Sequence, residues 1–233
     1  MSSEDTLAQE PFMPEDAFRT RGSDELYRLR IVHRKRGRLA MLSHLEVLRA
    51  MERTVRRAQL PFAITQGFSP HMKTRLGSAL PVGVGGEHEV FDVFLTSFLD
   101  PGLALDALRN ASVPDLMVES CQYVDVRCAA PNIQFPVSVY EVLLDDEPGE
   151  LSVPASVTVE KKGKLRDLVV ADYLIDGLHI EERTVEFSLF VSQTGSLRPD
   201  VFVAALLAGT NLKALSITRT RQLPDPFSIP LED

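Results

Sequence analysis

Two histidines in the first third of the chain have neighbours that proton transfer or phosphate binding would use. His44 follows Ser43, and His71 follows Gln66 and Ser69 within one short run. An imidazole exchanges a proton near neutral pH, and hydroxyl and amide groups can orient the molecule on which it acts. We therefore predict a specificity pocket formed by Ser43, His44, Gln66, Ser69 and His71. No residue is assigned firmly to catalysis. His44 and His71 are the candidates, and their alternative role is hydrogen bonding in a helix cap and a loop.

The position of His44 favours an anion over a metal ion as its ligand. Ser43 and Glu46 have the spacing of a capping box, which places His44 in the first turn of a helix. The positive end of the helix dipole lowers the pKa of a histidine there and attracts phosphate. His44 and the second histidine fix no metal site unless a carboxylate converges on them. Neither Cys121 nor Cys128 has the Cys or His neighbours of a zinc site. We expect no metal, no cofactor and no disulfide framework.

Basic residues are concentrated in one fifth of the chain. The net charge is -8, yet Tyr27–Leu76 contains 12 Lys and Arg against only Glu46 and Glu52, so this segment carries +10 and the remainder -18. The planar guanidinium group pairs well with phosphate oxygens. We predict an RNA- or phosphate-binding surface that consists of Arg34, Lys35, Arg36, Arg38, Arg49, Arg53, Arg56, Arg57, Lys73 and Arg75. The alternative is a solvated helix face that pairs with acidic residues of this chain or of a partner.

Other runs carry weaker signals. Gly83-Val-Gly85-Gly86 lacks the remaining residues of a nucleotide-binding loop, so it favours a tight hairpin turn. A second basic run either extends the cationic surface or protects an exposed edge strand; it contains Lys161, Lys162, Lys164 and Arg166. Few aromatic residues could stack on bases, and the candidates are Tyr27, Phe62 and Phe68. The sequence therefore gives no basis for assigning sequence-specific RNA recognition.

The elements that position these residues follow from the hydrophobic period. In the first half of the chain, it predicts a strand at Tyr27–Val32, a helix at about His44–Gln59, extended segments around an irregular loop at Gln66–His71, a strand at Val90–Leu95, a short helix from Asp100-Pro101 and a strand at Val118–Arg127. This is the βαββαβ order of a ferredoxin-like split βαβ sandwich.

A second unit of similar order follows. The predicted elements are a strand at Val137–Leu144, extended segments between Val157 and Ile180, a strand at Val185–Val191, a helix at Pro199–Leu207 and a strand at Leu215–Arg221. The expected fold is α+β, with two tandem ferredoxin-like (split βαβ) sandwiches, the second having its first helix reduced to Leu168–Leu174. The expected domains are an acidic flexible tail 1–25, a basic domain 26–128, a linker 129–136, a second domain 137–223 and a C-terminal tail 224–233.

Two motifs are the most specific in the chain, namely Ser43-His-Leu-Glu46 and Gln66-Gly-Phe-Ser-Pro-His71. Weaker ones include Leu80-Pro-Val-Gly83, Leu197-Arg-Pro199 and Ile217-Thr-Arg-Thr220. Together they resemble the bacterial radical SAM-linked protein family, also called the DUF2344 family, over about Tyr27–Leu223. Glu46 and Ser69 replace the Asp and Asn that other members usually have, and both keep similar side-chain chemistry.

The resemblance implies an accessory unit of a radical SAM protein, with RNA metabolism as the setting. The chain has no Cys-x3-Cys-x2-Cys cluster for an iron–sulfur centre, so any radical chemistry belongs to a partner. We expect a non-catalytic RNA-binding or substrate-presenting accessory protein, with RNA and a radical SAM protein as its partners. One alternative is a metal-independent RNA-processing enzyme that uses His44 or His71. Another is a pure protein-interaction module.

The sequence also bears on the membrane. No stretch approaches the roughly 18 consecutive apolar residues of a membrane span, and the N-terminus lacks the order of a signal peptide. The expectation is a soluble, cytoplasmic protein with no membrane partner.

Overall fold

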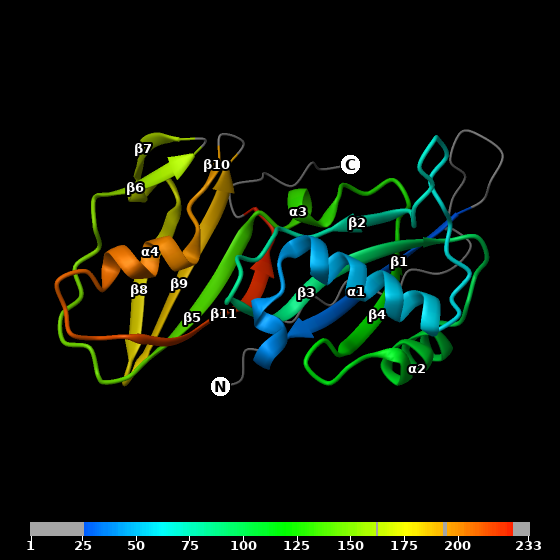
Figure 1. Ribbon diagram of the computed structural model, residues 1–233, viewed down its shortest axis with the longest axis horizontal. Coiled ribbons are helices and arrows are strands. Elements are labelled where there is room, and N and C mark those ends of the chain that lie inside the picture. The colour runs from blue at the N-terminus through cyan, green and yellow to red at the C-terminus, as the bar shows by residue number, and fades with distance from the viewer. Residues whose placement is uncertain (1–25, 162, 193–194, 226–233) are drawn as a thin grey trace, which may run out of the picture.

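The computed structural model describes residues 26–161, 163–192 and 195–225. The predicted tail 1–25, Lys162 and most of the predicted tail 224–233 lie outside them. Within the described residues the fold is α+β, with four α-helices, a nine-stranded mixed sheet and a separate two-stranded sheet. Figure 1 shows the large sheet running through both halves of the molecule.

The first half contains the predicted elements in the predicted order. They are β1 (Tyr27–Lys35), α1 (His44–Arg57), β2 (Thr74–Leu76), β3 (Gly85–Leu95), α2 (Pro101–Ala111) and β4 (Val118–Val124), with an additional 3-10 helix η2 (Gly37–Met41) after β1. The four strands lie in the order β4-β1-β3-β2, and each neighbouring pair is antiparallel. Asp100 caps α2, as its position before Pro101 predicts, by accepting hydrogen bonds from two backbone N–H groups.

The second half differs from the first between β5 (Val137–Leu144) and β8 (Leu174–Glu181), where it has a hairpin and a 3-10 helix instead of an α-helix. Its elements are α3 (Pro131–Gln134), β5, β6 (Ser156–Lys161), β7 (Lys164–Val169), the 3-10 helix η3 (Val170–Asp172), β8, β9 (Thr184–Ser192), β10 (Gly195–Ser196), α4 (Pro199–Leu206) and β11 (Ala214–Leu223). The reduced helix expected at Leu168–Leu174 is only η3, while β6 and β7 form a separate hairpin. The main strands lie in the order β8-β9-β5-β11.

Strands β3 and β11 join the two halves into one sheet. They are parallel, with Thr218 opposite Gly85 and Arg219 opposite Gly86. A Cβ atom on Gly85 would lie 3.3 Å from the Thr218 hydroxyl, and one on Gly86 would lie 2.5 Å from a carboxylate oxygen of Glu89. The glycine run therefore permits close approach at the junction, after a turn in which Gly83 has a φ of +88°.

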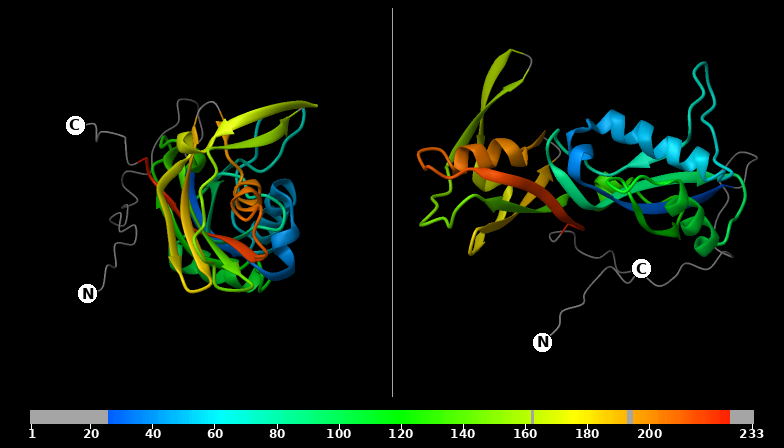
Figure 2. Two further views of the ribbon diagram at one scale, coloured as in Figure 1. Left: turned by 90° about the vertical axis from the view of Figure 1, so that its left-hand side faces the viewer. Right: turned by 60° about the horizontal axis from the view of Figure 1, so that its bottom comes forward.

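Each half has its own hydrophobic core on the helix-bearing face of the sheet. Met51 and Val55 of α1 pack with Phe91 of β3 in the first core, whereas Phe202 of α4 packs with Phe187 of β9 in the second. Figure 2 shows α1 and α4 on the same face of the sheet. Leu80 and Val84 come from the first half but belong to the second core, so the two halves also interlock through side chains.

The opposite face of the first half buries two arginines of the basic segment. Arg28 and Arg30 donate to the carboxylate of Asp92, which has no exposed surface, with Nε to oxygen distances of 2.8 and 2.9 Å. Arg28 also donates to the carbonyls of Cys128 and Ala129. These contacts keep the predicted linker 129–136, which contains α3, against the sheet. Two of the twelve basic residues are therefore structural.

Candidate functional site

Helix α1 presents a row of arginines to solvent. It begins as predicted, because the Ser43 hydroxyl accepts from the Glu46 N–H and the Glu46 carboxylate accepts from the Ser43 N–H. Met51, Thr54 and Val55 face the core. The exposed side carries Arg49, Arg53, Arg56 and Arg57. The helix ends two residues before its predicted end at Gln59, which has a φ of +56°.

These four arginines differ in their contacts with carboxylates, and Arg49 interacts electrostatically with Glu46. Arg56 lies 3.7 Å from the Glu52 carboxylate and over the ring of Phe62. Within the described part of the chain, no ion pair joins Arg49, Arg53 or Arg57 to a carboxylate. Because these three are spaced four residues apart, they form one row along the helix.

The other predicted phosphate-binding residues are placed differently. Arg34 and Arg36 pair with Glu119 and Glu87, so part of their charge is already neutralised. Arg38 is exposed in η2. Lys35 is not on the surface: only 1% of it is exposed, because its position in β1 directs it into the junction between the halves.

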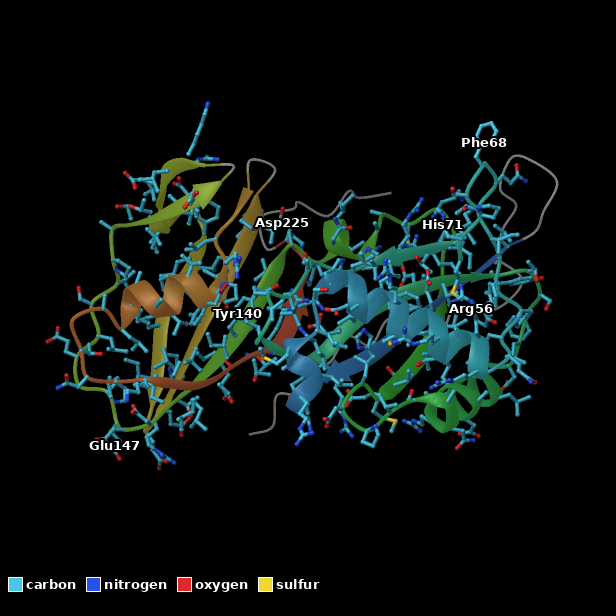
Figure 3. The ribbon with its side chains drawn as sticks, in the orientation of Figure 1. Arg56, Phe68, His71, Tyr140, Glu147 and Asp225 are labelled. Atoms are coloured by element: carbon cyan, nitrogen blue, oxygen red, sulfur yellow. The ribbon has the colours of Figure 1, made fainter. Side chains whose placement is uncertain are left out.

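The loop after α1 projects from the body and ends in an exposed aromatic residue. Ile64 and Met72 form a β-bridge at its base, and Lys73 donates its backbone N–H to Ala63. Phe68 is fully exposed at the tip (Figure 3). Lys73 lies over the Phe94 ring at the base, and the predicted phosphate ligand Arg75 is exposed in β2. The loop therefore has the aromatic residue Phe68 at its tip and the cationic residues Lys73 and Arg75 where it joins the sheet.

The predicted specificity pocket does not form as one site. His71 is exposed and bonds within its own loop, its Nδ1 lying 3.2 Å from the Thr65 hydroxyl and 3.1 Å from the Ser69 carbonyl oxygen. Gln66 and Ser69 are exposed beside it. His44 lies at the opposite end of α1, and a helix of 14 residues spans about 20 Å. His44 and His71 therefore cannot act together as acid and base on one substrate in this arrangement.

His44 instead lies at a cleft between the two halves, with a volume of about 410 Å³. The first half contributes His44, Leu76 and Ser78, and the second contributes Tyr140 of β5 and Arg198, which immediately precedes α4. Figure 3 shows Tyr140 at the centre of the molecule, well away from His71. The cleft thus combines an aromatic and apolar wall with cationic and hydroxyl groups.

Arg219 lines this cleft and forms an ion pair with Glu89, which is not among the residues that line it. Its Nε donates to one carboxylate oxygen of Glu89 at 2.9 Å, and a terminal nitrogen donates to the other. Further hydrogen bonds go to the Ser78 carbonyl at 2.6 Å and the Ser138 hydroxyl at 3.4 Å. Arg219 is 1% exposed and Glu89 8% exposed. Both carboxylate oxygens of Glu89 are therefore occupied.

Lys35 has no such partner. Its Nζ is buried and makes no hydrogen bond within the described residues. It lines a smaller hollow with His33, His44 and Glu89, which shares His44, Leu76, Gly77 and Ser78 with the main cleft. Burial lowers the pKa of the Lys35 ammonium, and the nearby Glu89 only partly opposes this effect.

Both histidines of the hollow are held toward the neutral form. Burial is the main cause of the lowered pKa of His33, which is opposed by Glu89. Burial also lowers the pKa of His44, and the positive charge of Arg219 adds to this effect. A neutral imidazole can donate one hydrogen bond and accept another.

One family model covers most of the chain, including every basic residue of the segment Tyr27–Leu76 and Arg198 at the rim of the cleft. Residues 28–199 match the model of a family described as an uncharacterized protein conserved in bacteria, DUF2344, which is well over half of the chain. The chain belongs to the DUF2344 family. None of the curated proteins compared with it matches.

Sequence reasoning missed Arg219, Glu89, Tyr140 and Arg198 as site residues of this DUF2344 protein. The signal that could have found the two arginines is the pair of motifs Leu197-Arg-Pro199 and Ile217-Thr-Arg-Thr220, which contain them. Arg198 lies inside the family match, whereas Arg219 lies beyond its end. Glu89 and Tyr140 belong to ordinary alternating strands, where no local pattern separates them from other polar or aromatic positions.

The described residues show neither a metal-ligand cluster nor a membrane-spanning helix. No three His, Cys, Asp or Glu side chains among them are grouped as metal ligands would be. None of their helices has both the length and the apolar composition needed to cross a bilayer. Cys121 and Cys128 are free thiols, and burial raises the pKa of Cys121 to about 11 and also raises that of Cys128.

Proposed function

We propose that this DUF2344 protein is a non-catalytic RNA-binding or substrate-presenting accessory protein that acts with a radical SAM partner in RNA metabolism. The observation that carries the proposal is the row Arg49, Arg53 and Arg57, which is exposed and forms no ion pair with a carboxylate within the described residues. The radical SAM partner rests on the resemblance of the sequence motifs alone.

The cationic row and the projecting loop suit a single RNA strand. Phosphates would lie along the row, where guanidinium groups are spaced by one helical turn. Phe68 at the loop tip would stack on an unpaired base, which is a sequence-tolerant interaction. Such binding carries no catalytic requirement, in keeping with the separation of His44 from His71.

We further propose that both halves are ferredoxin-like units. The strand orders β4-β1-β3-β2 and β11-β5-β9-β8 support this reading because they are the same when each half is numbered from its own first strand. In the second half, the β6–β7 hairpin and η3 take the place of the first helix. The tandem arrangement would then present the basic helix of one unit beside a cleft shared by both.

The test is a filter-binding titration of labelled single-stranded RNA at low salt. We expect the double variant Arg53→Glu/Arg57→Glu to lose at least tenfold in affinity and to show a shallower salt dependence, because each lost phosphate contact removes about 0.7 from the slope of log affinity against log salt. The matched control is Arg127→Glu/Arg183→Glu, which makes the same charge change at exposed positions of other segments.

Two results would count against the proposal. Absence of RNA binding by the unmodified chain at low salt would reject it outright. Equal loss of affinity in both double variants would show that only the net charge matters, so no face could be assigned.

A further inference from the structure

The cleft between the halves receives the N-terminal ends of two helices. His44, the first residue of α1, and Pro199, the first residue of α4, both line it. Figures 1 and 2 show the two helices extending away from the centre in opposite directions on one face of the sheet. The first backbone N–H groups of a helix lack intrahelical acceptors, and the dipole makes that end positive. Although Ser43 already accepts from the Glu46 N–H of α1, the dipole of each helix favours negative charge at its end beside the cleft.

A buried side chain in the hollow that adjoins the cleft gives independent evidence for an anion. Lys35 is 1% exposed, and its Nζ has no hydrogen-bond partner within the described residues. The nearest acidic group in the hollow, Glu89, already accepts from Arg219 through both oxygens. An unpaired buried charge is costly, so Lys35 needs either an anionic partner or the loss of its proton.

The other walls suit an organic group attached to that anion. Tyr140, Leu189 and Leu197 provide aromatic and aliphatic surface, while Asn132 and Ser196 provide polar atoms. A volume of about 410 Å³ falls within the roughly 300–1,000 Å³ of small-molecule sites. Inorganic phosphate alone would leave most of the cleft unfilled.

We propose that this cleft and the adjoining hollow together bind a phosphate monoester, with the phosphate at the Lys35 ammonium and the N-terminus of α1 in the hollow and the organic group against Tyr140 in the cleft. Arg198 stands at the rim, where it pairs with Asp200 and is 58% exposed, and it can turn toward the ligand. A dianionic phosphate is favoured in the hollow because Lys35 and the N-terminal end of α1 both line it.

This site goes beyond the proposed RNA-binding face and lies at the other end of α1 from Phe68. The same chemistry is offered by a free nucleotide and by the terminal phosphate of an RNA strand. Binding experiments with matched probes separate these two sources.

The experiment is isothermal titration of the full chain with adenosine 5′-monophosphate, adenosine and inorganic phosphate, and with a short RNA that has either a 5′-phosphate or a 5′-hydroxyl. We expect adenosine 5′-monophosphate to bind at least tenfold more tightly than adenosine or inorganic phosphate. If the 5′-phosphate instead strengthens RNA binding at least tenfold while the mononucleotide binds weakly, the phosphate source is an RNA end.

The variants test whether this effect belongs to the cleft. Lys35→Met should abolish the preference for the phosphorylated probe, whereas Lys213→Met, the same change at an exposed position just before β11, should preserve it. Arg198→Ala, at the exposed rim, should weaken the binding of the phosphorylated probe severalfold. This variant provides the test if Lys35→Met does not fold.

The proposal is overturned if phosphorylated and unphosphorylated probes bind equally. It is also overturned if a folded Lys35→Met variant or Arg198→Ala keeps the full preference. Binding of 5′-hydroxyl RNA through the arginine row should survive Lys35→Met, so failure of this site leaves the proposed function separately testable.

Discussion

Glu89 of β3 and Arg219 of β11 form a buried ion pair that joins the two halves of the sheet. Nε of Arg219 lies 2.9 Å from a carboxylate oxygen of Glu89, although 130 positions separate the two residues in sequence. Arg219 lies opposite Gly86, the residue whose missing Cβ makes room for the Glu89 carboxylate. The junction, the position of Arg219 in the cleft and the surroundings of Lys35 therefore depend on one carboxylate.

Replacing that carboxylate should strongly destabilise the protein. We expect Glu89→Gln to lower the free energy of unfolding by about 3–5 kcal/mol, because it leaves Arg219 buried beside Lys35 without a negative charge. Urea unfolding followed by circular dichroism measures the change. The control is Glu186→Gln, which removes a solvent-accessible pair with Arg221 and should cost no more than about 1 kcal/mol. Equal effects of the two changes would contradict the structural importance of the pair.

Alanine substitutions of the glycines at the junction should destabilise the protein to different degrees. Gly86→Ala should destabilise by about 1–3 kcal/mol, since its Cβ would meet the Glu89 carboxylate at 2.5 Å. Gly85→Ala should cost less, because the contact with the Thr218 hydroxyl would be 3.3 Å. Gly149→Ala has nothing within 4 Å and should stay within about 0.5 kcal/mol of the unmodified chain. Thermal unfolding gives the order, and a Gly149 effect as large as that of Gly86 would refute it.

Because His33 is buried and His44 is half-buried, we expect the free energy of unfolding to fall in mild acid. Burial holds the folded-state pKa of His33 and His44 below the ordinary value of 6.5. Below pH 6.5 the unfolded chain binds protons that the folded chain does not, so stability is full above that pH and declines below it. The decline stops once the pH is below the lowered folded-state pKa, and it is at most about 1.4 kcal/mol per pH unit for each histidine.

Urea unfolding at pH 7.5 and pH 5.5 measures this decline. His33→Gln should show a smaller loss between the two values than the unmodified chain. His179→Gln, which changes an exposed histidine, should lose as much stability as the unmodified chain. An unchanged decline in His33→Gln would show that His33 is not held neutral in the fold.

A substitution in the projecting loop should affect RNA binding differently from substitutions in the arginine row. Phe68→Ala should cost about 1–3 kcal/mol of binding to single-stranded RNA while leaving the salt dependence unchanged, because stacking neutralises no phosphate. Its folding stability should not change, since Phe68 is fully exposed. Leu165→Ala, at another exposed apolar position, is the control. Unaltered RNA affinity of Phe68→Ala would remove the loop from the interface.

Local features of the fold were predictable because their causes lie within a few residues. The capping box of Ser43 and Glu46 and the position of Asp100 before Pro101 place the starts of α1 and α2. The alternating pattern beginning at Tyr27 correctly indicates a strand. The period of α1 likewise separates its buried face from its arginines. The sequence predicts extended structure between Val157 and Ile180, but it does not indicate that β6 and β7 pair as a separate hairpin, because strand pairing depends on contacts with the rest of the fold.

By itself, the sequence determined the local elements and the concentration of positive charge between Tyr27 and Leu76. Only the tertiary structure decided which of those charges face outward. Arg28 and Arg30 turn inward because Asp92 meets them from the neighbouring strand, more than 60 positions away. Lys35 turns into a small hollow that adjoins the cleft between the two halves. His44 and His71 are separated because the rigid helix α1 lies between them. The sequence alone does not show which parts of the fold the two ends of that helix contact.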